Sequence, residues 1–269
     1  MLHHLNLWCS FPEDFALTLP TLTSLRLSGK FSSYGSFARF MTGFPALQDL
    51  ALYDVNWEAS PDDLTFPRLE LKSLTLSWDP DFRPPAKAIE SVILSLRTRA
   101  LTVYHMGIFP ADYLRSLSKY LHHLGGHLQY LCLPMEIIQR KVCMLDFRHS
   151  TALRHLKIEN AVSVSVRHAA GPSAWASPDV ERILANIIAH CRLETLSFSA
   201  QSGGSKNYSW KPLPQWITEL KLNVNLNAIR EIRFIVVGLS GLRDSDGRKD
   251  LESVLSALPQ STIGEIVFE

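Results

Sequence analysis

The chain has 269 residues, of which 46% are hydrophobic and 20% are charged, and its formal net charge is +1. This is an ordinary globular composition with enough apolar material for a sizeable core. The small net charge provides no overall field that would favour nucleic acid or an acidic membrane, so we expect neither as a partner. No stretch reaches the length of a membrane span, and the first residues lack a secretory pattern.

The cysteines are sparse and widely spaced, at positions 9, 132, 143 and 191. None forms a CxxC pair of the kind used for zinc binding or redox chemistry. We interpret them as free thiols in a reducing compartment and expect a cytoplasmic or nuclear protein.

A short apolar pair, Leu-x-Leu or its equivalent, recurs along the chain, and a third apolar residue precedes most pairs by three positions. Alternate residues of a strand share a face, so the paired leucines would enter one core and the residues between them would point away. Stacked units of this kind predict a parallel sheet with a continuous leucine core. The pairs, separated by 20, 25, 24, 27, 30, 25 and 40 residues, are Leu5/Leu7, Leu25/Leu27, Leu50/Leu52, Leu74/Leu76, Leu101/Val103, Leu131/Leu133, Leu156/Ile158 and Leu196/Phe198.

Between the predicted strands, the apolar residues follow a helical period. In 86–97, for example, Ile89, Val92, Ile93 and Leu96 fall on one helical stripe. The sequence predicts helices over 33–43, 86–97, 111–126, 177–191 and 248–259.

The pattern becomes irregular after about residue 160. Residues 161–168 alternate and predict an extra strand or a hairpin arm, whereas 169–178 and 199–214 are loop-like. Within 216–238, only Glu231–Val237 clearly predicts a strand, and 264–269 predicts a final one. We therefore expect a single domain over 1–269, with regular repeats over about 1–160 and irregular repeats with a C-terminal cap over about 161–269.

Alternating strands and helices are also typical of doubly wound nucleotide-binding folds. That fold needs a glycine-rich turn after its first strand, and residues 9–12, Cys-Ser-Phe-Pro, contain no glycine. The later Gly203-Gly204 lacks the spacing that cradles phosphates, which favours the repeat interpretation.

The recurring L-x-x-L-x-L pattern resembles the core of the leucine-rich repeat. The block FPALQDLALYDVNW at 44–57 and the ending REIRFIVVG…IGEIVFE resemble the repeat region of fungal F-box-type proteins, especially those of mushrooms. The resemblance implies an α/β leucine-rich-repeat solenoid, a curved horseshoe with its parallel sheet on the concave side and helices or turns on the convex side. It also implies the substrate-recognition surface of a cullin-type ubiquitin ligase.

In that family, a short helical F-box ahead of the repeats binds the ligase adaptor. This sequence begins inside a repeat, at Leu2, and we expect no F-box within it. A ligase adaptor is therefore expected as a partner only where an F-box lies upstream.

No motif in the sequence points to catalysis. His122, His123 and His127 lie around the helix break at Gly125-Gly126, which does not suit a metal site. Cys132 is predicted to be a surface thiol without an activating base. The tryptophans at 8, 57 and 78 are predicted to pack at strand-to-helix corners. We expect no enzyme activity, no cofactor and no metal.

The outward face of the predicted sheet is the candidate site, because it mixes tyrosines with small polar residues in the manner of protein-recognition surfaces. Crowding on the inside of a curved sheet would also select small residues. We predict a non-catalytic protein–protein interaction module on this concave face. The alternatives are an intracellular scaffold without a ubiquitin link and an enzyme with a site in the 161–178 and 199–214 loops. The predicted binding residues are Arg26, Asp49, Tyr53, Thr75, Thr102, Tyr104, Tyr130, Cys132, His155, Lys157, Glu159 and Ser197.

Overall fold

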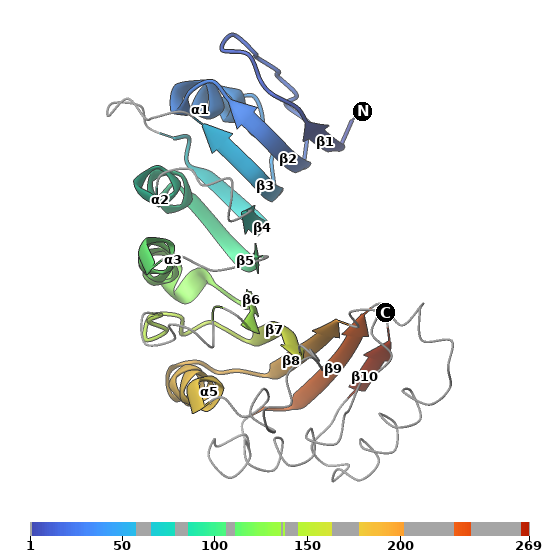
Figure 1. The fold of residues 1–269 in the computed structure, drawn as a ribbon, viewed down its shortest axis with the longest axis vertical. Helices are drawn as coiled ribbons and strands as arrows, with labels where there is room; N and C mark the ends of the chain where they lie inside the picture. Colours follow the sequence, from blue (N-terminus) through green and yellow to red (C-terminus); the bar gives the residue numbers. More distant parts are fainter. Residues whose placement is uncertain are drawn as a thin grey trace, which may run out of the picture. The chain divides into compact units, whose positions relative to one another are not determined.

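The computed structural model is an α/β structure built around parallel strands (Figure 1). Its residues group into two compact units, which are described separately. Unit 1 comprises Met1–Leu131 and Cys143–Ala152, and unit 2 comprises Cys132–Val142 and Leu153–Glu269. The structure describes residues 2–57, 66–78, 86–105, 111–135, 137, 145–162, 178–201, 229–237 and 265–268. The expectation of one domain over 1–269 stays a prediction.

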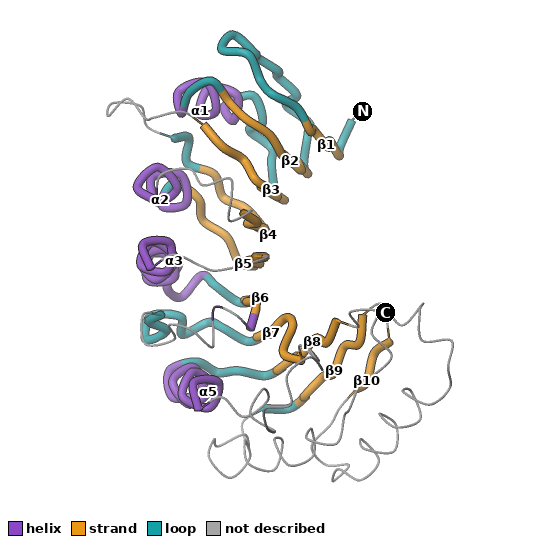
Figure 2. The backbone as a smooth tube through the Cα atoms, viewed as in Figure 1, coloured by secondary structure: helices purple, strands orange, loops and turns teal. Residues whose placement is uncertain are grey.

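Unit 1 contains five parallel strands that pair in chain order, with helices between them. Figure 1 shows the three helices on one side of these strands, and Figure 2 shows loop rather than helix between β1 and β2. The elements are β1 (His4–Trp8), β2 (Ser24–Phe31), α1 (Tyr34–Thr42), β3 (Asp49–Trp57), β4 (Leu69–Trp78), α2 (Ala86–Leu94), β5 (Leu96–His105), α3 (Ala111–Leu124) and the 3-10 helix η1 (Gly125–His127).

Unit 2 repeats the parallel arrangement with β7 (His155–Val162), α5 (Pro178–His190), β8 (Thr195–Gln201), β9 (Glu231–Val237) and β10 (Glu265–Phe268). These four strands also pair in chain order. Strand β6 (Tyr130–Pro134) begins in unit 1 and ends in unit 2. The predicted strands at Glu231–Val237 and near the C-terminus are therefore confirmed.

The register of the strands confirms the leucine pattern. In unit 1, Leu25 pairs with Leu50, Leu50 with Leu74, and Leu74 with Leu101. All four are buried to 1% exposure or less, as are the leucines or valine two residues further along in β2, β4 and β5. Unit 2 continues the same rule, since Leu156 pairs with Leu196. Because each leucine lies beside its equivalent on the next strand, the core is a continuous apolar layer.

A repeated backbone contact also links successive strands. The carbonyl oxygen of His3 accepts hydrogen bonds from the N–H groups of two consecutive residues, Thr23 and Ser24, at 3.1 and 3.0 Å. The carbonyl of Thr23 does the same for the next strand, at 2.8 and 2.9 Å. This contact satisfies backbone groups where the chain turns into each strand. The same arrangement recurs at the carbonyls of Gln48, Arg154 and Glu194, so it occurs in both units.

The leucine that precedes each Leu-x-Leu pair by three positions packs beside the point where the chain turns into the strand. Leu22, Leu47, Leu128 and Leu153, each three residues ahead of its pair, are buried. Leu2 differs, with 49% of its surface exposed. It precedes the first strand, where no earlier described strand lies beside it to bury its side chain.

Aromatic packing covers the core near α1. The helix begins with a capping box in which Ser33 and Ser36 exchange hydrogen bonds with each other's backbone N–H groups. Its Phe37 stacks on Trp57 with ring centroids 5.2 Å apart, and Phe11 stacks on Phe31 at 4.3 Å. The packing role predicted for Trp57 is confirmed, although Trp57 is the last residue of β3 and does not follow the strand.

The helices predicted over 33–43, 86–97, 111–126 and 177–191 are confirmed in position but not at every boundary. The helix predicted over 86–97 ends at Leu94, and Leu96 instead begins β5. Leu96 pairs with Leu69 of β4, so ladder hydrogen bonds and burial on the sheet replace the last helical turn. The helix predicted over 111–126 ends at Leu124, followed by η1, and the one over 177–191 spans Pro178–His190.

Several predictions fall on parts of the chain outside the described residues. They concern 163–177, 202–228 and the helix over 248–259. In the range 161–168, predicted as an extra strand or a hairpin arm, residues 161 and 162 complete β7. In the range 199–214, predicted to be loop-like, residues 199–201 instead complete β8. Among the helices that the structure describes, none combines the length and apolar character needed to cross a membrane.

Candidate functional site

The strand register of unit 1 arranges the outward residues into rows that cross the sheet. Each row takes one residue from each of β1 to β5, and neighbouring members are about 4.8 Å apart. We call this surface the outer face of unit 1. Its three rows are His4–Ser24–Asp49–Ser73–Ala100, Asn6–Arg26–Ala51–Thr75–Thr102 and Trp8–Ser28–Tyr53–Ser77–Tyr104.

The third row alternates aromatic residues with serines. Trp8, Tyr53 and Tyr104 lie on every second strand, so adjacent aromatic residues are separated by about 10 Å. Trp8 is 77% exposed and Tyr104 is 38% exposed. The row members between these rings are serines, Ser28 and Ser77. The row therefore offers a partly apolar surface with hydroxyl groups at regular intervals.

All six predicted binding residues from β2 to β5 lie on the outer face of unit 1. A hydrogen bond also links two of its strands, because the Ser73 hydroxyl donates to Asp49 Oδ1 at 2.6 Å. That bond holds the Asp49 carboxylate in a fixed position at the edge of the face. The six residues are Arg26, Asp49, Tyr53, Thr75, Thr102 and Tyr104.

Trp8, the most exposed aromatic residue on this face, is not among the predicted binding residues. Trp8 was predicted to pack at a strand-to-helix corner, but it is the last residue of β1 and points away from the core. The alternation of side chains along a strand predicts that Trp8 lies on the outer face, because Trp8 directly follows the inward-facing Leu7. No described strand lies beyond β1 to cover the indole.

The predicted residues of unit 2 form a more charged and less exposed face. Lys157 Nζ lies 3.1 Å from Glu159 Oε1, and the two side chains are only 20% and 12% exposed. In the register, Ser197 lies between Lys157 and Arg233, and these longer side chains leave it 9% exposed. Ser197 is thus largely buried, whereas His155, at the start of β7, is exposed.

The prediction of a surface thiol at Cys132 is wrong. Cys132 is 1% exposed, and its neighbours in β6 and Met135 are buried as well. Alternation along a strand determines where a side chain points, but it does not reveal whether that side is covered. Tyr130, at the start of β6, is half-buried and remains partly accessible.

The histidines near the end of α3 do not converge on a common point. The His122 ring contacts the His149 ring edge-on, with centroids 4.0 Å apart, whereas His123 stacks beside Tyr120. Within the described ranges, no group of three potential metal ligands comes together, and Cys9, Cys132 and Cys191 form no disulfide. The expected absence of metal, cofactor and enzyme activity stays a prediction.

The sequence matches none of the family models and none of the curated proteins with which it was compared.

Proposed function

We propose that this protein is a non-catalytic protein–protein interaction module, and that its strand units are leucine-rich repeats whose outer face binds another protein. The row Trp8–Ser28–Tyr53–Ser77–Tyr104 is the observation that carries the proposal. Rigid aromatic side chains contribute large contact areas at little entropic cost, and small hydroxyl groups between them adapt their hydrogen bonds to a partner.

Two backbone features support the assignment to leucine-rich repeats. The inward leucines pair with their equivalents from strand to strand, and the paired N–H contact to one carbonyl recurs at the start of five strands. Both features require that each strand and the turn ahead of it repeat the backbone path of the preceding strand and turn. They support a leucine-rich-repeat solenoid with the sheet on its concave side, in line with the resemblance to fungal F-box-type proteins.

The composition of the outer face defines the chemistry of the partner. Its charged residues, Arg26 and Asp49, are of opposite sign, so the surface does not select a strongly charged partner. We expect a polypeptide that places apolar side chains on Trp8, Tyr53 and Tyr104 and offers hydrogen-bonding groups to the serines between them.

Quantitative co-purification from the organism's own cells tests the proposal. The triple variant Trp8→Ser, Tyr53→Ser, Tyr104→Ser should lose a specific set of partners that the wild-type protein retains. The matched control alters the helical side through Arg115→Ser and Lys119→Ser, since both side chains are exposed on α3. Equal partner sets for wild type and triple variant, with both folded by circular dichroism, would refute the proposal.

The same experiment distinguishes a ligase receptor from a scaffold. For the protein as its own cells produce it, co-purification of a cullin-ligase adaptor supports a substrate receptor. Partners without an adaptor support the scaffold alternative. Because an F-box would bind the adaptor outside the outer face, adaptor recovery should be the same for wild type and triple variant.

A further inference from the structure

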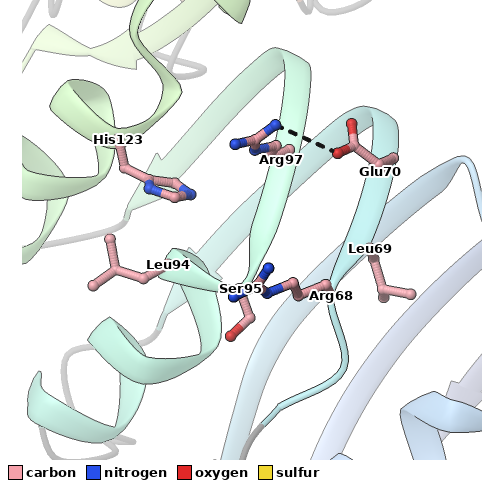
Figure 3. A pocket seen from close by; sticks show the side chains of 7 residues that line it. All are labelled: Arg68, Leu69, Glu70, Leu94, Ser95, Arg97 and His123. Atoms are coloured by element: carbon pink, nitrogen blue, oxygen red, sulfur yellow. Dashed lines mark ion pairs between the residues drawn. The ribbon is translucent and has the colours of Figure 1, made fainter.

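A second feature of unit 1 lies away from the outer face, where the chain enters β4 and β5. There, a cavity of about 270 Å³ is lined by seven residues (Figure 3). They come from the segment ahead of β4, the starts of β4 and β5, the ends of α2 and α3, and the residue that joins α2 to β5. The lining residues are Arg68, Leu69, Glu70, Leu94, Ser95, Arg97 and His123.

Positive groups dominate this cavity. In Figure 3 the His123 ring on α3 points toward the guanidinium of Arg97 on β5, and Arg68 extends toward Ser95. The only carboxylate in the lining is Glu70, which lies 3.8 Å from Arg97 across a contact between exposed side chains. Such a long, solvated ion pair is weak and easily replaced. Among the described residues, Arg68 has no ion-pair partner.

Hydrogen bonds from Ser95 satisfy part of the end of the neighbouring helix. The Ser95 N–H donates to the Val92 carbonyl and the Ser95 hydroxyl donates to the Ser91 carbonyl, at 3.0 and 3.1 Å. The carbonyl of Ser95 accepts from Leu69 N–H. The Ser91 and Val92 carbonyls therefore do not need Arg68 or Arg97 as donors.

Several positive groups act electrostatically on His123. The pKa of His123 lies below its ordinary value, because burial removes water from the ring and because several cations surround it. Those cations are Arg97 on β5, Arg68 ahead of β4, His122 on α3 and His127 in η1. An anion in the cavity would relieve this repulsion and restore the proton on His123.

We propose that Arg68, Arg97 and His123 form a binding site for a phosphate group, carried by free phosphate or by a phosphorylated side chain. Guanidinium groups match the geometry of phosphate oxygens through paired N–H donors, and the imidazole adds a third donor when protonated. The cavity is larger than one phosphate group, which leaves space for the atoms that carry it. Leu69 and Leu94 offer apolar contacts to those atoms.

Nuclear magnetic resonance of the histidine rings tests this site directly. Inorganic phosphate should shift the His123 signals in a saturable way, whereas chloride at the same ionic strength should not. Arg68→Gln and Arg97→Gln should each weaken binding by about tenfold or more, the loss expected for a charged hydrogen bond. Arg99→Gln is the matched control, because Arg99 is exposed on the same strand but does not line the cavity.

Glu70→Gln should strengthen phosphate binding, since it removes the carboxylate that competes for Arg97. This opposite sign separates ligand binding from a loss of folding, which would weaken every variant. A phosphoserine peptide that binds more tightly than inorganic phosphate would identify a protein-borne group, and equal affinities would identify free phosphate. The proposal is overturned if neither probe gives a saturable shift, or if Arg99→Gln weakens binding as much as Arg97→Gln does.

The pH dependence provides a second readout with sulfate, which remains a dianion near neutral pH. Its affinity should rise as pH falls through the pKa of His123, and His123→Gln should remove that dependence. Glu70, Arg68 and Arg97 also line the cavity, and His122 and His127 act electrostatically on His123, so the affinity is measured by calorimetry, which reports on wild type and His123→Gln alike. A pH dependence unchanged in His123→Gln would contradict a role for this ring.

Discussion

Replacing Leu74 by alanine tests whether the leucine pattern builds the core. Leu74 lies in β4, pairs with Leu50 and Leu101 on the neighbouring strands, and has no exposed surface. The substitution removes three buried carbon atoms, worth about 2.4 kcal/mol at about 0.8 kcal/mol each. The close packing on both sides should prevent collapse of the cavity, which adds about 1 kcal/mol. We expect a loss of about 3–4 kcal/mol in the free energy of unfolding.

The assay is urea unfolding followed by circular dichroism, with Thr75→Ala as the matched control. Thr75 is the next residue along β4 and lies on the outer face, half-buried. It should cost less than about 1 kcal/mol, because it leaves no sealed cavity. Similar losses for the two variants would refute the assignment of inward and outward positions.

Three further substitutions probe local features by the same unfolding assay. Gly29→Ala should destabilise the protein by about 2 kcal/mol or more, because Gly29 has φ +136° and a Cβ would lie 1.8 Å from the Cys9 carbonyl oxygen. Tyr120→Phe should leave stability unchanged or raise it by up to about 1 kcal/mol, because the buried Tyr120 hydroxyl has no hydrogen-bond partner among the described residues. Arg148→Met should flatten the decline of stability in acid, because hydrogen bonds from Arg148 lower the pKa of Asp146.

The sign of the last effect follows from the lowered pKa. A carboxyl group with a depressed pKa stabilises the folded state above its unfolded value of 3.8, and that contribution disappears as pH falls through the folded pKa. Without Arg148, less stability remains to be lost below that value. Parallel acid profiles for wild type and variant would contradict this reasoning. A Gly29→Ala variant as stable as wild type would contradict the prediction for Gly29. A loss of more than about 1 kcal/mol in the free energy of unfolding of Tyr120→Phe would contradict the prediction for Tyr120.

The strands and their inward leucines could be predicted because the signal is local and has a period of two. Leu50 and Leu52, for example, need only a neighbouring strand with the same spacing to pair in register. The end of the helix over 86–97 could not be placed, because Leu96 satisfies both the helical stripe and the strand ladder. Pairing with Leu69, which lies 27 positions earlier, decides between them.

The sequence predicts which face of the sheet each side chain of the candidate site points to, but it does not predict how exposed that side chain is. The alternation placed Arg26, Tyr53 and Thr75 on one face, as the register confirms. It did not reveal that Cys132 is covered, because burial depends on segments distant in the sequence. The cavity around His123 also escaped prediction, since its residues come from elements that only the fold brings together.

Site-specific photo-crosslinking in the organism's own cells tests the proposed binding face most directly. A photoreactive residue at Tyr53, in the middle of the aromatic row, should form a discrete adduct with a partner protein. The same residue at Arg115, exposed on α3, should not form that adduct. An adduct that forms equally at both positions, or only at Arg115, would contradict the assignment of the outer face as the binding surface.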